Sequence, residues 1–228
     1  ASSDRYAVVT WRNVQSSNTE NPVDFNVCDN VYARVYDKVK DTWSESICLY
    51  NGETGKVGAL EAAILEDGTA MAAYVVKTGD DDSISTDSEV MYSTINPDGT
   101  LGNCIRITNN DQADRNVQVT SLKWNGEERF ILGWYNEKQR EKIEEKAEDS
   151  KSEDAVLDME KDIRLQAVDK TGLPCDDFIE SIKQAGAEKI STNFRFSKPA
   201  GNGTINDLSI VWVETESKEQ KDDSKQQE

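Results

Sequence analysis

The chain has 228 residues, with 44 acidic against 26 basic residues and a formal net charge of -18. Such a surface repels phosphate backbones and anionic lipids, which excludes nucleic acid as the first-choice partner. Histidine is absent, which removes Ser-His-Asp and Cys-His nucleophile schemes and most catalytic zinc sites. No apolar run approaches the roughly 18 residues that a membrane span requires, so we expect no membrane span.

The N-terminus shows no basic and then apolar pattern of the kind that marks a signal peptide. Only Ala1 to Arg5 precede the first expected strand. We therefore expect that targeting residues were removed before this numbering begins and that the protein is extracellular or on the cell surface. A cytosolic protein is the alternative.

Four stretches along the chain share a short apolar strand that ends in an aromatic residue. They are Ala7–Trp11, Met71–Tyr74, Ile131–Trp134 and Ser209–Trp212. A second strand that closes on Asp or Asn follows the first three, at Val31–Asp37, Val90–Asn96 and Ile163–Asp169. The turns after these strands carry Asx residues, which bond their own backbone, and in two of them a Gly for the left-handed position.

The stretch from Gly58 to Gly79 shows the repeat most clearly, as two apolar runs on either side of Asp67-Gly68. Asp-Gly supplies the positive backbone angles of a tight hairpin turn. The alanine-rich runs could instead be helical, but Tyr74-Val75-Val76 favours strands, because aromatic and β-branched residues fit a pleated sheet.

Two further strands complete each unit. An outer strand is expected at Trp43–Leu49, Cys104–Thr108 and Phe178–Ile182, and a strand before the aromatic-ended one at Leu60–Leu65, Val117–Trp124 and Asn193–Phe196. With the strands lettered A to D, the chain reads BCD, ABCD, ABCD, AB. A unit of about 60 residues and four strands has the size of a propeller blade.

The chain also resembles a known family of repeats, through Trp11, the stretch Tyr32–Asp37 and Trp43-Ser44. These residues are similar to the recurring YVVW, VYYSRYD and WS pattern in the blades of bacterial secreted β-propellers of the sialidase-like type. The resemblance covers nearly the whole chain. The Asp box of true sialidases (SxDxGxTW) and the GH and WD pairs of WD40 blades are absent.

These patterns predict an all-β fold: a partial β-propeller of four-stranded antiparallel blades over residues 1–216. An all-β sandwich of the same hairpins is the alternative. The smallest propellers need about four such blades, more than these strands supply, so the remaining blades would come from flanking sequence or a second chain. The stretch Glu137–Asp162 is a charged insertion, helical or disordered, and Ser217–Glu228 is a disordered tail or linker.

The repeated aromatics Trp11, Tyr74, Trp134 and Trp212 are expected to fill the core between neighbouring blades rather than to form a ligand platform. Trp124 differs, because it stands beside the Asn125-Gly126 turn. It is therefore the candidate ligand-binding aromatic.

Acidic loops provide candidate calcium ligands, chiefly Asp80, Asp82 and Asp87, with Glu89 nearby. The stretch Asn109–Asp114 is a second candidate of the same kind. Neither has the spacing of an EF-hand, and a solvated acidic loop is the alternative. No other cofactor is expected. The cysteines Cys28, Cys48, Cys104 and Cys175 are too few and too widely spaced for a disulfide scaffold, although one disulfide stays open.

The first functional hypothesis is a non-catalytic extracellular propeller segment of a bacterial surface or secreted protein, acting as a scaffold or as a glycan- or protein-binding module. The alternative is part of a carbohydrate-active enzyme, since glycoside hydrolysis needs only two carboxylates. Glu61, within an otherwise apolar strand, is the catalytic candidate, and an edge-facing or hydrogen-bonded glutamate is the favoured alternative.

Overall fold

The fold was taken from a computed structural model. It describes residues 1–16, 27–52, 57–77, 88–110, 112–124, 126–139, 159–175, 195–196 and 210–211. Over these ranges every regular element is a β-strand, so the predicted all-β class is confirmed there. The same residues contain no helix that could cross a membrane.

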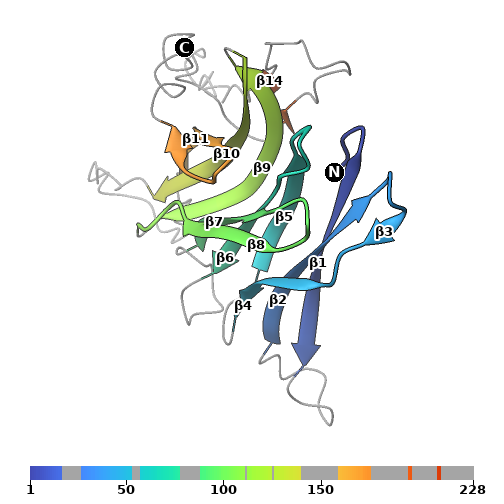
Figure 1. Cartoon of the computed structure of the whole chain (residues 1–228). Coiled ribbons are helices and arrows are strands. Elements are labelled where there is room, and N and C mark those ends of the chain that lie inside the picture. The colour runs from blue at the N-terminus through green and yellow to red at the C-terminus, as the bar shows by residue number, and fades with distance from the viewer. Residues whose placement is uncertain are drawn as a thin grey trace, which may run out of the picture.

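The strands form successive antiparallel meanders in chain order (Figure 1). The first meander contains β1 (Tyr6–Ser16), β2 (Val27–Asp37), β3 (Thr42–Trp43) and β4 (Ile47–Asn51). The second contains β5 (Val57–Ile64), β6 (Ala70–Lys77), β7 (Ser88–Ile95) and β8 (Leu101–Arg106). The third contains β9 (Ala113–Trp124), β10 (Glu127–Gln139), β11 (Met159–Asp169) and β12 (Pro174–Cys175), and a two-stranded sheet of β13 (Arg195–Phe196) and β14 (Ile210–Val211) follows.

The second and third meanders belong to one eight-stranded sheet, because β7 and β9 run parallel and pair where Ser88 lies beside Ala113. The first meander is a separate four-stranded sheet. None of the sheets in the described ranges closes on itself. The predicted antiparallel meanders are present, but the second and third share one mixed sheet and are not separate blades, so a propeller remains a proposal.

The meanders pack face to face. Because side chains alternate along a strand, β6 packs against the first meander with one face and against the third with the other. Its residues Ala70, Ala72, Tyr74 and Val76 lie in a core cluster with side chains of the first meander. The intervening Met71, Ala73 and Val75 lie in a second cluster with side chains of the third. The apolar run of β6 is thus buried on both faces, as expected for a central layer.

The turns within the meanders repeat one geometry at Gly68, Gly99 and Gly172. Each glycine has a positive φ, of 93°, 83° and 85° respectively. Each glycine amide donates to the carbonyl three residues earlier, at 3.1, 2.9 and 3.0 Å. The left-handed glycine predicted for these turns is confirmed, and it lets a short connection reverse the chain with little strain.

Two predicted elements differ from the structure. The expected strand Trp43–Leu49 is split into β3 and β4, because the three residues 44–46 lie opposite only two residues of β2, 34 and 35. Ser44 still bonds Val35 there: its amide donates to the Val35 carbonyl at 2.7 Å and its hydroxyl accepts the Val35 amide hydrogen at 3.0 Å. The ends of the charged insertion are strand rather than helix, since residues 137–139 and 159–162 extend the β10–β11 ladder. Extending a formed hairpin adds backbone hydrogen bonds without a new helix nucleus. Residues 140–158, Phe178–Ile182 and the tail lie outside the described ranges.

Of the four repeated aromatics, Tyr74 and Trp134 are buried between neighbouring meanders, as predicted. Trp11 is a correction: its side chain is only half-buried and stacks on Tyr32 at 5.7 Å. No described strand covers that face of the first meander. Trp212 lies outside the described residues.

Candidate functional site

A buried carboxylate, that of Asp114 at the start of β9, bonds β10 and the connection between β8 and β9. Its Oδ1 accepts hydrogen bonds from Trp134 Nε1 at 3.0 Å and from Asn136 Nδ2 at 2.8 Å. Its Oδ2 accepts one from Asn110 Nδ2 at 3.0 Å. Three donors fix this carboxylate as an acceptor, which suits a structural anchor more than a proton-transfer group.

A second buried carboxylate, Glu89, lies at the start of β7. Its Oε1 accepts the Asn110 amide hydrogen at 3.0 Å and forms an ion pair with Arg106 at 2.9 Å. Its other oxygen, Oε2, is buried without a hydrogen-bond partner. Asn110 thus bonds to both carboxylates, those of Glu89 and Asp114.

The three main calcium candidates, Asp80, Asp82 and Asp87, lie outside the described residues, so their prediction stays open. In the part of the chain that the structure describes, no three acidic, cysteine or histidine side chains gather closely enough to hold a metal ion.

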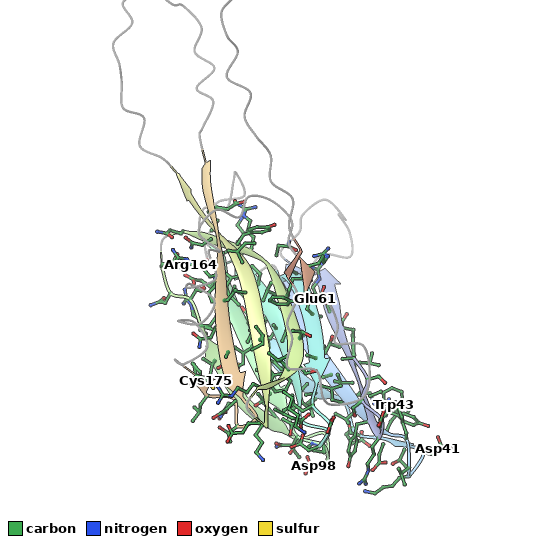
Figure 2. The ribbon with its side chains drawn as sticks, turned by 90° about the horizontal axis from the view of Figure 1, so that it is seen from above. Asp41, Trp43, Glu61, Asp98, Arg164 and Cys175 are labelled. Atoms are coloured by element: carbon green, nitrogen blue, oxygen red, sulfur yellow. The ribbon has the colours of Figure 1, made fainter. Side chains whose placement is uncertain are left out.

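The catalytic candidate, Glu61, lies in β5 with an exposed side chain (Figure 2). Gln118 Nε2 donates to its Oε1 at 3.4 Å. This arrangement matches the hydrogen-bonded glutamate that the sequence offered as the non-catalytic interpretation. No described carboxylate is hydrogen-bonded or ion-paired to Glu61, so the arrangement gives no support to a two-carboxylate mechanism.

The ligand candidate, Trp124, ends β9 and its backbone pairs with Glu127 across the turn to β10. Its neighbours Lys123 and Gly126 line a polar hollow of about 500 Å³. The hollow is formed by the turn ends of the second and third meanders. Its lining residues are Glu66, Asp67, Lys123, Gly126, Glu127, Glu128, Asp169, Lys170 and Thr171.

A hydrogen bond joins two of the turns that line the hollow, and others lie within the third turn. Glu128 Oε1 accepts the Glu66 amide hydrogen at 2.9 Å. Asp169 Oδ1 accepts from the amide and hydroxyl of Thr171 at 2.8 and 2.7 Å. Burial acts to raise the pKa of Asp169, but these hydrogen bonds outweigh it and the pKa lies below its ordinary value. Carboxylates and two lysines give the hollow both acceptors and donors for a polar ligand.

The outward face of the first meander carries a group of aromatic side chains that the sequence did not predict as a surface. Trp11 stacks on Tyr32, and Tyr36 contacts Trp43 with ring centroids 4.9 Å apart. The Arg34 guanidinium lies 5.6 Å from the centre of the Trp43 ring. Strand alternation places these residues on one face, and that pattern is the signal that would have found them.

The thiols of Cys48 and Cys104 form no disulfide. The Cys175 thiol donates to the Leu173 carbonyl at 3.9 Å. Cys28 lies in β2, and its side chain is outside the described set. Cys104 lies within 3.7 Å of the Tyr74 hydroxyl, which also contacts Ser93 at 3.0 Å. Burial raises the pKa of Tyr74 above its ordinary value, so the phenol stays protonated.

Comparison with known proteins gives no relative from which an activity could be carried over. No protein family, no characterised protein and no solved structure matches this chain. Its function therefore has to be argued from its own residues.

Proposed function

We propose that the chain is a non-catalytic segment of an extracellular β-propeller, part of a bacterial surface or secreted protein, and serves as a scaffold and binding module for a glycan or protein. The observation that carries this proposal is the stacking of successive four-stranded meanders in chain order. Blades of a propeller follow one another in this way.

The register within the meanders supports the repeat. Trp11 pairs with Tyr32, Tyr74 with Met91, and Trp134 with Arg164. In each meander the repeated aromatic therefore pairs with the residue at the same position of the strand that follows it, counted from the start of the repeated pattern. Equivalent positions in equivalent strands favour a repeated unit over a sandwich of unrelated hairpins.

The turn-end hollow is the binding site in this proposal, and Trp124, the residue next to Lys123 in the chain, is its proposed aromatic. Sugars combine hydroxyl groups, which the carboxylates and lysines of the hollow can bond, with apolar ring faces that stack on indole. The chain is acidic overall, so an uncharged or cationic ligand meets less repulsion than an anionic one.

A glycan array of the chain tests this site, followed by titration calorimetry with the best ligand. We expect Trp124→Ala and Lys123→Ala each to weaken binding by roughly tenfold, about 1.4 kcal/mol. Lys40→Ala, in the β2–β3 turn of the first meander, is the matched control and should bind as the unaltered chain does. If no glycan on the array binds, the glycan-binding form of the proposal is contradicted. If all three variants lose affinity equally, the hollow is not the binding site.

Calcium binding at Asp80, Asp82 and Asp87 is a further part of the proposal. It is supported by the buried, unpartnered Oε2 of Glu89, a few residues after these aspartates in the sequence. Calorimetric titration with CaCl₂ should show a binding heat that Asp82→Asn removes and that MgCl₂ does not reproduce. An unchanged thermal unfolding midpoint in calcium and in chelator would exclude this part of the proposal.

A further inference from the structure

The outward face of the first meander is an unpartnered sheet face with an apolar centre. We call Val9, Trp11, Tyr32, Arg34, Tyr36 and Trp43 the aromatic face. Val9 and Trp43 are each 47% exposed. Tyr32 and Tyr36 are four residues apart on β2, so the two aromatic pairs are separated by about 13–14 Å along the strand. A patch of this kind on a soluble protein is typical of an interaction surface.

In the next two meanders, the residues equivalent to Val9 of the aromatic face are covered by a neighbouring sheet. The cross-strand pair Val9–Arg34 of the first meander is equivalent to two other pairs. They are Ala72–Ser93 in the second meander and Leu132–Gln166 in the third. Ala72 and Leu132 are both fully buried, against the preceding meander in each case. Val9 occupies the same place with nothing over it in the described residues.

The same comparison holds at the other end of the face. Tyr36 is opposite Ala7, as Ile95 is opposite Ala70 and Val168 is opposite Phe130. Ile95 and Val168 have no exposed surface and lie in the two clusters between meanders. The aromatic face therefore continues a stacking interface that the chain forms twice within itself.

The opposite end of the stack is already covered in the described part of the chain. Leu122, Ile131 and Ala167 of the third meander are buried, and Phe196 of β13 packs against them. The uncovered apolar sheet face that a second copy of the chain presents is consequently the aromatic face as well. An interface formed by the same patch on both subunits has two-fold symmetry.

Charge also favours contact between copies at this face. The chain carries a net charge of -18, yet none of the six residues of the aromatic face is acidic. The single cation, Arg34, is drawn to one end, where its Nε donates to the Ser44 carbonyl at 2.8 Å. Two acidic chains therefore meet with less repulsion here than across their acidic loops.

We propose that the aromatic face is the interface of a homodimer, in which the Trp11–Tyr32 end of one copy packs against the Tyr36–Trp43 end of the other. This interface is independent of the turn-end hollow and of any glycan. It supplies the first meander with the covering sheet that the second and third meanders obtain from their neighbours in the chain.

Sedimentation velocity of the complete chain, from low micromolar concentration upwards, tests the proposal. We expect a dimer whose population rises with concentration. Val9→Lys should weaken it by roughly tenfold or more, because the added ammonium group would be buried beside Arg34, which lies directly opposite, without a partner. Val9→Asp should weaken it less, because Arg34 can pair with the new carboxylate. Val39→Asp is the matched control: Val39 is 74% exposed in the β2–β3 turn, outside the aromatic face, and its variant should dimerise normally.

A monomer at every concentration overturns the proposal, and so does a dimer that both Val9 variants leave intact. Binding of a soluble oligosaccharide that depends on Val9 and Trp43, without dimerisation, would assign the face to a glycan instead. Thermal unfolding of each variant is the control that checks whether it remains folded. Trp124→Ala should leave the dimer unchanged, so failure of the glycan proposal and failure of this one are separable.

Discussion

At the scale of single residues, the turn glycines do more than reverse the chain. A Cβ at Gly68 would lie 2.4 Å from Cδ2 of Tyr6, and one at Gly99 would lie 2.2 Å from the Ser44 Cβ. Both contacts join the second meander to the first. The turn glycines therefore serve local backbone geometry and the close approach of neighbouring sheets together.

Substitution by alanine separates these two roles. Gly68 and Gly126 both have positive φ, but a Cβ at Gly126 would meet nothing within 4 Å. We expect Gly126→Ala to cost about 1 kcal/mol of unfolding free energy from backbone strain alone. Gly68→Ala should cost about 2–4 kcal/mol, because overpacking is added. Urea unfolding of both variants measures the difference, and equal costs would mean that the Tyr6 contact is unimportant.

The ion pair between Arg5 and Asp37 predicts a pH dependence. The Arg5 Nη2 donates to Asp37 Oδ2 at 3.1 Å, and this hydrogen bond holds the pKa of Asp37 below its ordinary value. A carboxyl with a lowered pKa stabilises the fold above its unfolded pKa, and that contribution is lost as the pH falls through the folded value.

Asp37→Asn should therefore lower the thermal unfolding midpoint at neutral pH, and its curve should converge with that of the unaltered chain once the pH falls below the lowered pKa of Asp37. Circular dichroism melts at a series of pH values measure this. A difference that stays constant down to the lowest pH would show that the pair contributes through packing rather than charge.

At the scale of elements, the connection from β8 to β9 is fixed by buried polar groups. Asn110 binds both Glu89 and Asp114, and Ser88 donates from its hydroxyl to the Asp114 carbonyl at 2.9 Å. The connection thereby holds the first strand of the third meander beside β7. Ser88, Glu89 and Asp114 are buried, so each depends on a protein partner for its hydrogen bonds, whereas Asn110 is exposed.

Asp114→Ala should be strongly destabilising, by about 2–4 kcal/mol, because Trp134 and Asn136 would keep buried donors without an acceptor. Asp98→Ala is the control: that carboxylate accepts from Thr100 in an exposed turn, and we expect a cost below about 1 kcal/mol. Guanidinium unfolding measures both. Similar costs for the two variants would argue that the buried network is not what joins the meanders.

At the scale of the whole molecule, equivalent positions differ in burial according to whether a neighbouring sheet is present. Leu132 lies between two meanders, whereas Val9 lies on the bare face. We expect Leu132→Ala to cost about 2–5 kcal/mol and Val9→Ala to stay within about 0.5 kcal/mol. Denaturant unfolding at the lowest practical protein concentration, where a dimer dissociates, measures both. A large cost at Val9 would mean that another part of the chain covers the face.

Much of the local structure was predictable, because its causes are local. Asp67-Gly68 predicts a hairpin turn, and the structure places Gly68 at a φ of 93° between β5 and β6. Strand ends were less predictable: β10 runs to Gln139, into a stretch rich in Glu and Lys. The composition of that stretch favours a helix or a solvated loop, and only pairing with β11 makes it strand.

The candidate sites, too, were only partly predictable from the sequence. The sequence drew attention to Asp114 and Glu89 as members of acidic stretches, but not to Asn110 as the residue that bonds both. Glu61 stood out in an apolar strand, and only its position beside Gln118 shows how its carboxylate is used. Contacts between strands of different meanders have no sequence signature of their own.

By itself, the sequence determined the β-class, the left-handed turn glycines and which side chains share a face, since these follow from local sterics and a period of two residues. Tertiary structure alone decided which of those faces are covered. Tyr74 and Trp11 are similar residues at equivalent positions, yet one is buried and the other half-exposed. Alternation fixes the direction of a side chain, whereas its burial depends on a second sheet that packs against it.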